Sequence, residues 1–170
     1  MSPVAYISLG SNLGNSQQIL LVAVSRLQQF SDEPIACSSF WLTTPVDCPP
    51  GSPPFVNAVV GLRPRSGESP ETLLQKLRDL EVELGRRPKQ VLNEPRTLDL
   101  DLISFGAETR QSRHLNLPHP RAHGRRFVLQ PLSEIAPDLI LPGQTRNVRQ
   151  LLIELPAGEI IAKIQPENRN

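Results

Sequence analysis

Two aspartates at alternate positions have the clearest potential for chemistry in this 170-residue sequence. Asp99 and Asp101 belong to the run PRTLDLDL at residues 95–102. In a strand, residues two apart share a face, so both carboxylates would project from one side, about 6–7 Å apart at the backbone. Magnesium is commonly held by one or two carboxylates, with phosphates and waters completing its octahedron. The run therefore predicts a magnesium site.

The alternative for this run is an ordinary strand with polar residues on its solvent side. Aspartate is uncommon in strands. In regular alternation, Ile103 and Phe105 would share the face of the two aspartates, so that face would not be simply solvated. The sequence therefore favours the metal site.

Basic residues lie on both sides of the aspartate run. Those before it are Arg86, Arg87, Lys89 and Arg96, and those after it include Arg121, Arg125 and Arg126. Guanidinium groups match phosphate oxygens bidentately and can neutralise charge during phosphoryl transfer. The sequence contains no GxxxxGK[ST] run, so nucleotide phosphates would have to be held by metal and arginine. The alternative is a solvated basic loop, which the neighbouring aspartates disfavour.

An aromatic residue and an amide are spaced for binding a flat heterocycle. Phe55 and Asn57 are two apart in an apolar run, so in a strand they share a face. An amide that both donates and accepts hydrogen bonds, beside a ring, suits a polar heterocycle. A core aromatic beside a turn asparagine explains the spacing equally well. His119 and His123 are separated by Pro120 and lack cysteine or acidic partners, so we expect no zinc site.

Hydrophobic periodicity and turn residues predict the elements that must position these groups. We expect strands over 4–9, 35–42, 55–62 and 98–105, helices over 19–30 and 70–84, and loops over 43–54 and 86–97. The order β-α-β-β-α-β predicts an α+β, ferredoxin-like antiparallel sheet with both helices on one face. A loop-rich C-terminal extension should follow, with helices near 127–135 and 148–155.

Composition restricts the class of protein. Apolar residues are 38% and charged residues 21% of the sequence, enough for one domain over 1–170 with a core at about 3–142. The formal charge of +1 argues against a polybasic nucleic-acid or membrane binder. Neither a signal peptide nor a spanning apolar run is evident, and two cysteines are too few for a disulfide framework. We expect a cytoplasmic protein, by default a monomer, that binds small molecules and neither nucleic acid nor membranes.

Four runs together carry a resemblance to a known family. They are GSNLG at 10–14, FVNAV at 55–59, PRTLDLDL at 95–102 and PHPR at 118–121, followed by Phe127 and Pro-Leu at 131–132. In order and spacing they resemble 6-hydroxymethyl-7,8-dihydropterin pyrophosphokinase over residues 4–142. The resemblance implies a folate-pathway enzyme that transfers the pyrophosphoryl group of ATP to the pterin's hydroxymethyl oxygen and releases AMP.

The resemblance also implies roles for individual residues. Asp99 and Asp101 would hold two magnesium ions, and Arg86 and Arg96 would be the catalytic arginines that engage the transferring phosphates. The pterin would contact Thr43, Val46, Phe55, Asn57 and Phe127. ATP would contact Glu81, Arg86, Arg96, Leu102, His119 and Arg125.

The basic loop departs from the family pattern. The family's common run Arg-Trp-Gly-Pro-Arg is replaced by LNEPR at 92–96, so Asn93 stands in place of the tryptophan that closes over the pterin. Pro88 stands where many members have a second loop arginine.

Two other classes of protein remain as alternatives. A nucleotide-sugar transferase also uses D-x-D with a divalent metal, but the element order and the short chain disfavour it. A ferredoxin-like RNA-binding module would use the basic stretch. Seven aromatic residues and a near-zero net charge make that class a poor fit.

Overall fold

The computed structural model describes residues 3–159 and 161–165. Residues 1–2, 160 and 166–170 of the predicted 1–170 domain lie outside the described residues. The elements are β1 (Ala5–Ser11), α1 (Ser16–Gln28), β2 (Ala36–Cys37), β3 (Trp41–Thr43), β4 (Phe55–Leu62), α2 (Pro70–Glu83), β5 (Asp99–Phe105), β6 (Arg110–Gln111), β7 (Asn116–Leu117), a 3-10 helix (Ala122–Gly124), α3 (Arg126–Ile135), α4 (Val148–Glu154) and β8 (Ile161–Lys163). Among the described helices, none is both long and apolar enough to cross a membrane.

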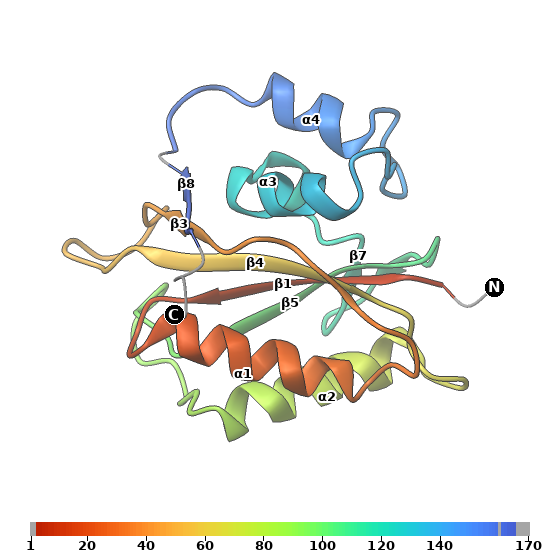
Figure 1. The fold of residues 1–170 in the computed structure, drawn as a ribbon, viewed down its shortest axis with the longest axis horizontal. Helices are drawn as coiled ribbons and strands as arrows, with labels where there is room; N and C mark the ends of the chain where they lie inside the picture. The colour runs from red at the N-terminus through yellow and green to blue at the C-terminus, as the bar shows by residue number, and fades with distance from the viewer. Residues whose placement is uncertain (1–2, 160, 166–170) are drawn as a thin grey trace.

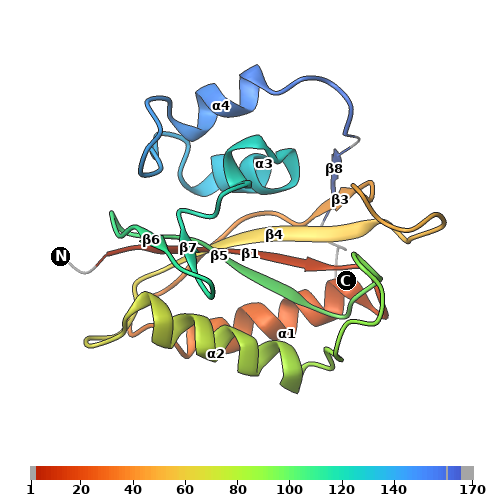
Figure 2. The ribbon, with the colours of Figure 1, turned by 180° about the vertical axis from the view of Figure 1, so that it is seen from behind.

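One mixed-length antiparallel sheet organises the chain. Its strands lie in the order β5-β1-β4-β3-β8, and β2 also pairs with β4. Figure 1 shows α1 and α2 on one face of the sheet and α3 and α4 on the other, and Figure 2 shows the same layers from behind. The predicted α+β class with an antiparallel sheet is confirmed. The two C-terminal helices, predicted near 127–135 and 148–155, form the second layer.

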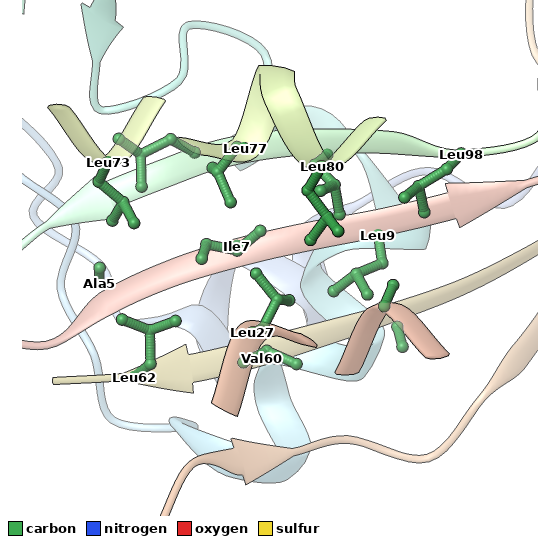
Figure 3. Packing of buried hydrophobic residues seen from close by; sticks show 14 of the residues in the cluster. Ala5, Ile7, Leu9, Leu27, Val60, Leu62, Leu73, Leu77, Leu80 and Leu98 are labelled. Carbon is green, nitrogen blue, oxygen red and sulfur yellow. The ribbon is translucent and has the colours of Figure 1, made fainter. Parts of the chain in front are cut away.

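Local sequence explains the two helices of the first layer. The Ser69 side chain accepts a hydrogen bond from Thr72 N at 3.1 Å, and Pro70 occupies the first helical turn of α2. Asn15 caps α1 in the same way by accepting from Gln18 N. Leucines at helical spacing on α2 then meet alternate apolar residues of β1, as Figure 3 shows for Leu77 and Ile7.

The predicted strand 35–42 is instead two short strands, β2 and β3. Ser38 separates them, and its Oγ accepts a hydrogen bond from Val59 N at 2.9 Å and donates to Ser39 O at 2.8 Å. A side chain that bonds the backbone replaces the regular ladder at this point. The apolar pattern could not show this interruption.

The structure also corrects the face of the sheet predicted for Phe105, which does not share the face of the two aspartates. The pairing of β5 with β1 shifts by one residue, because Leu102 pairs with Ile7 but Ser104 pairs with Tyr6. Ile103 is the extra residue of this bulge. Phe105 therefore joins the core beneath α1 and α2, whereas Ile103 packs in the separate cluster beneath α3.

Strands β6, β7 and β8 were not expected. Each has only two or three residues, too few for the alternation that identifies a strand. The second layer packs on the other face of the sheet through small clusters centred on Val59 with Leu129, and on Ile103 with Val128. The polar end of β1, β4 and β5 on this face lines a cleft.

Candidate active site

Gly10 brings the two halves of the predicted site into one row. It pairs with Asp99 of β5 on one side and with Asn57 of β4 on the other. Residues paired in register across antiparallel strands share a face, and neighbouring strands are about 4.8 Å apart. Asp99 and Asn57 thus lie about 10 Å apart at the backbone, on the same face, with only a glycine between them. Asp101 follows on that face opposite Ser8.

This row forms the floor of a cleft of about 640 Å³. The loop after β3 and the loop after α2 lie at the same end of the sheet (Figure 1) and contribute walls, and the start of α3 contributes the opposite side. The lining residues are Ser8, Gly10, Thr43, Thr44, Val46, Asp47, Cys48, Phe55, Asn57, Asn93, Arg96, Asp99, Asp101, Pro120, Arg121, His123, Gly124, Arg125, Phe127 and Glu159.

Asp99 is held between two arginines. Its Oδ1 accepts from Arg86 Nη1 at 2.7 Å, and its Oδ2 accepts from Arg96 Nη1 at 3.3 Å. Burial lowers the pKa of Arg86, but the charges of Asp99 and Glu81 outweigh it, so the net pKa is raised. These contacts place two permanent positive charges beside the first carboxylate of the pair.

Asp101 is the second carboxylate of the pair, and like Asp99 it is half-buried. Its removal from solvent, and then the charge of Asp99, raise the pKa of Asp101 above its usual range. Two oxygen donors that repel each other in this way suit a hard divalent cation, whose charge would stabilise both ionised carboxylates. Among the described residues no third His, Cys, Asp or Glu joins them. Magnesium fits this donor set, because it needs few protein carboxylates when phosphates and waters supply the remaining ligands.

Glu81 fixes Arg86 from beneath the strand. Its side chain is 1% exposed, and Oε2 accepts from Arg86 Nη1 and from Leu100 N. Oε1 accepts from Arg78 Nη1 at 2.6 Å. Since both oxygens are bound within the protein, Glu81 positions Arg86 and the backbone of β5.

Arg96 connects the basic loop to β1 and to the cleft. Its backbone N donates to Asn12 Oδ1 at 2.9 Å, and its backbone O accepts from Asn12 N at 3.1 Å. The guanidinium carbon lies 5.5 Å from the centroid of the Phe55 ring. Within the described residues, Arg96 Nε is buried without a hydrogen-bond partner. This donor is therefore left unsatisfied by the part of the protein that the structure describes.

Asn57 and Thr43 form a buried polar corner beside Phe55. Asn57 Nδ2 donates to Thr43 Oγ1 at 2.6 Å, and both residues are 4% exposed. The bond fixes the amide so that Oδ1 lies toward Gly10. The corner offers oriented donor and acceptor groups next to an aromatic ring, the combination that a flat polar heterocycle requires.

Comparisons with known proteins identify the family of this chain. The family model described as 7,8-dihydro-6-hydroxymethylpterin-pyrophosphokinase matches residues 6–137. The 2-amino-4-hydroxy-6-hydroxymethyldihydropteridine pyrophosphokinase of Haemophilus influenzae is 40% identical over 152 residues, which cover 89% of each chain. The chain belongs to this pyrophosphokinase family.

Further relatives extend the match. The Pseudomonas aeruginosa enzyme of the same name is 35% identical, covering 89% of this chain and 91% of its own. The structure of Plasmodium falciparum HPPK-DHPS has a TM-score of 0.69 at 12% identity, so it supports the fold alone. This chain is covered over 90% of its length and spans 43% of that chain. As a family member, the protein is an enzyme of folate biosynthesis that transfers pyrophosphate from ATP to hydroxymethyldihydropterin.

Most of the residues predicted for the pyrophosphokinase site meet in the cleft. They are Thr43, Val46, Phe55, Asn57, Arg96, Asp99, Asp101, Arg125 and Phe127. Glu81 and Arg86 lie outside its lining but are joined to Asp99 through the contacts above. Leu102 is 3% exposed and its side chain packs in the core beneath α1 and α2, so only its backbone could meet ATP.

His119 lies immediately before two lining residues, Pro120 and Arg121. Its N donates to Ile103 O at 2.8 Å, and its Nδ1 accepts from Arg121 N at 3.2 Å. Burial, and then the charges of Arg125 and Arg121, lower the pKa of His119 to about 4. The imidazole is therefore neutral at physiological pH, with Nδ1 as the acceptor.

Several contacts around the cleft of this pyrophosphokinase were not predicted from the sequence. Asn93 Nδ2 donates to Asp47 O at 2.8 Å, and the two residues have φ of 55° and 53°. This bond joins the loop after α2 to the loop after β3. Their positive φ gives no signal in a sequence, because asparagine and aspartate occur in many kinds of turn. Glu159 comes from the C-terminal extension, where no motif drew attention to it.

Proposed function

We propose that ATP and the pterin occupy the two ends of this cleft, with the reacting groups above Gly10. The register of Asp99, Gly10 and Asn57 is the observation that carries this assignment. It supports a phosphate end at the carboxylates and a heterocycle end at the amide, on one face and about two strand spacings apart. The pterin ring is assigned to Thr43, Val46, Phe55, Asn57 and Phe127.

Asp99 and Asp101 are proposed to hold two magnesium ions. The ions would neutralise charge on the phosphate oxygens and orient the pyrophosphoryl group. The Arg96 side chain reaches Asp99 from the basic loop. Its Nη1 donates to the Asp99 carboxylate, and its buried Nε has no hydrogen-bond partner among the described residues. Arg86, oriented by Glu81, adds a second guanidinium.

The residues of the chain act mainly by positioning. In the transfer, the hydroxymethyl oxygen forms a bond to the β-phosphorus of ATP as the bond from that phosphorus to the α-bridging oxygen breaks. AMP leaves, and the hydroxyl proton passes to solvent. In-line placement and the arginine donors account for most of the expected acceleration, with little need for a strong base.

The remaining ATP contacts stay predictions. They involve Arg125, His119, the backbone of Leu102 and Glu81, whose two carboxylate oxygens already accept hydrogen bonds within the protein. The monomeric state and the cytoplasmic location also stay predictions.

The test is AMP release with ATP, magnesium and 6-hydroxymethyl-7,8-dihydropterin. We expect AMP only when all three are present, and loss of turnover in EDTA that excess magnesium restores. Release of AMP without the pterin, or turnover that persists in EDTA, would contradict the proposal.

A further inference from the structure

The row of paired residues on the cleft floor continues beyond Asn57 to a tryptophan. Trp41 of β3 pairs with Asn57 of β4, on the side of Asn57 away from Gly10. Because residues paired in register share a face, the Trp41 side chain lies on the face that α3 covers. Two residues further along β3, Thr43 accepts the hydrogen bond that fixes the Asn57 amide. Trp41 therefore adjoins the predicted pterin contacts from outside the lining of the cleft.

A carboxylate of α3 holds Trp41 from the second layer. Trp41 Nε1 donates to Glu134 Oε1 at 2.6 Å, and Ser39 Oγ donates to Glu134 Oε2 at 2.8 Å. Ser39 N donates to the same Oε2 at 3.4 Å, and Lys163 Nζ lies 3.7 Å from it. Hydrogen bonds to an ionised group are stronger than those between neutral groups. Both oxygens of Glu134 are thus engaged with β3 and with the residue two positions before Trp41.

The sheet alone holds β3 weakly. The strand has three residues, so it forms few ladder hydrogen bonds with β4. Its middle residue, Leu42, points to the opposite face and is 44% exposed, so it adds little packing. By contrast, α3 is fixed to β4 by a buried cluster that includes Val59, Leu129 and Leu132. Loss of the bonds to Glu134 would therefore release β3 rather than the helix.

The same helix carries the predicted ring contact of the pterin. Phe127 lies seven residues before Glu134 in α3, which is about two turns, so both side chains lie on one side of the helix. Phe127 lines the cleft from α3, and Thr43 lines it from β3. Figures 1 and 2 both show β3 beside one end of α3. Glu134 therefore joins the two walls that carry Phe127 and Thr43.

We infer that Glu134 is a positioning residue for the pterin, which acts through Trp41. By fixing β3 against α3, it sets the separation between the Phe127 ring and the polar corner of Thr43 and Asn57. Binding of a flat heterocycle between a ring and a polar corner depends on this separation to within about 1 Å. The inference rests on the pterin assignment proposed above.

The experiment compares pterin and ATP in the full chain. Glu134→Ala removes both acceptors and should raise the KM for 6-hydroxymethyl-7,8-dihydropterin about fivefold to twentyfold at saturating ATP and magnesium. The kcat at saturating pterin should stay within about twofold of wild type, and so should the Kd of ATP measured by calorimetry. The carboxylates and arginines assigned to the phosphates lie on β5, in the basic loop and at the start of α3, none of which depends on β3.

Two further variants test whether the hydrogen bond to Trp41 carries the effect. Glu134→Gln removes the charge but keeps an oxygen that can accept from Trp41 Nε1, so its pterin KM should return to within about threefold of wild type. Trp41→Phe keeps a ring and removes the donor, so it should also raise the pterin KM. Combined with Glu134→Ala, it should give a loss smaller than the product of the two single losses, because both substitutions remove one contact.

Glu154→Ala is the matched control, because it removes an acid of α4 in the same layer that pairs with Arg146 on the surface. Its pterin KM should stay within about twofold of wild type. An unchanged pterin KM in Glu134→Ala would overturn the inference, and so would equal losses for pterin and ATP. Equal losses in Glu134→Gln and Glu134→Ala would assign the effect to charge and also overturn it.

If Glu134→Ala does not fold, Trp41→Phe decides, and an unchanged pterin KM in that variant would overturn the inference. Failure of the wild type to turn over the pterin at all would instead contradict the proposed function.

Discussion

Gly10 and Asn57 face each other across β1 and β4 so closely that a side chain at residue 10 would strike the amide. A Cβ at Gly10 would lie 2.9 Å from Asn57 Oδ1 and 3.7 Å from Phe55 Cδ1. The absent side chain therefore leaves the space that the observed orientation of Asn57 requires, whereas Phe55 would only be in ordinary van der Waals contact. The same glycine separates Asn57 from Asp99 in the row.

Gly10→Ala should weaken pterin binding about tenfold or more, because the amide must rotate away from the position that its bond to Thr43 fixes. ATP binding in the same variant should stay near the wild-type value. Calorimetry with each ligand makes the comparison. If both ligands lose affinity equally, residue 10 supports the sheet as a whole rather than the orientation of Asn57.

Asn57→Ala should also weaken pterin binding more than ATP binding. Removing the amide leaves the buried Thr43 hydroxyl without the donor that reaches it at 2.6 Å, and the pterin loses a partner. A loss of about 1–3 kcal/mol in pterin binding follows. Equal losses for the two ligands would show that Asn57 serves the fold.

The sequence predicted the floor of this site better than its rim. Alternation in PRTLDLDL placed Asp99 and Asp101 on one face, because a regular strand has a fixed period of two. The same rule failed at Phe105, where an added residue in β5 reverses the alternation and no local residue type announces it. The antiparallel class of the sheet was still predicted, because that prediction depends on the order of whole helices and strands. Their hydrophobic patterns are long enough to tolerate such local errors.

The rim depends on contacts between residues far apart in the chain. Asn93 bonds the backbone of Asp47 across 46 positions, and β8 pairs with β3 through only three residues. Neither contact has a periodicity or a motif of its own. The family model could not supply them, since Asn93 departs from the family pattern and β8 lies beyond residue 137, where the family model ends.

Asp101→Asn should abolish turnover yet stabilise the magnesium-free fold. The folded protein raises the pKa of Asp101 through burial and then the Asp99 charge, so ionisation of this acid disfavours folding. The wild type therefore loses stability relative to the variant as pH rises from about 4 to beyond the raised value. Melting temperatures in EDTA at several pH values test this. A variant that melts lower than wild type at neutral pH would contradict it.

Asp99→Ala should abolish turnover as well, with a different effect on stability. Asp99 accepts hydrogen bonds from Arg86 and Arg96, so its removal leaves two guanidinium groups without that partner. Loss of these bonds offsets the relief of repulsion with Asp101, and the melting temperature in EDTA should change little. Near-wild-type turnover of either aspartate variant at saturating magnesium would count against the whole assignment.

His119 should remain neutral well below the pH at which an exposed histidine titrates. Burial, and then the charges of Arg125 and Arg121, lower its pKa to about 4, and its Nδ1 accepts a hydrogen bond. Because the unfolded chain takes up the proton first, the stability that neutral His119 contributes is lost as pH falls from about 6.5 toward 4. Ring resonances followed by NMR, assigned with His119→Gln, measure the value. Titration near 6.5 would contradict the buried environment.

The basic loop provides a matched pair of arginines. Arg96 reaches Asp99, its Nε is buried without a partner among the described residues, and its ring contact with Phe55 joins the two ends of the cleft. Arg87 lies exposed in the same loop and lines a second hollow, which Arg86 and Arg96 also line, but not the cleft itself. Arg96→Ala should lower kcat about a hundredfold or more and affect ATP binding much less, because the donor acts chiefly on charge that develops during transfer.

Arg87→Ala is the control for this variant. It removes the same charge from the same loop, so any effect of overall potential on ATP binding should be shared by both variants. We expect its kcat and KM to stay within a few-fold of wild type, since its side chain does not line the cleft. Steady-state kinetics with ATP and the pterin varied in turn compare the two. If Arg87 proves indispensable and Arg96 dispensable, the phosphates lie on the outer side of the loop. The placement of the reacting groups above Gly10 would then be wrong.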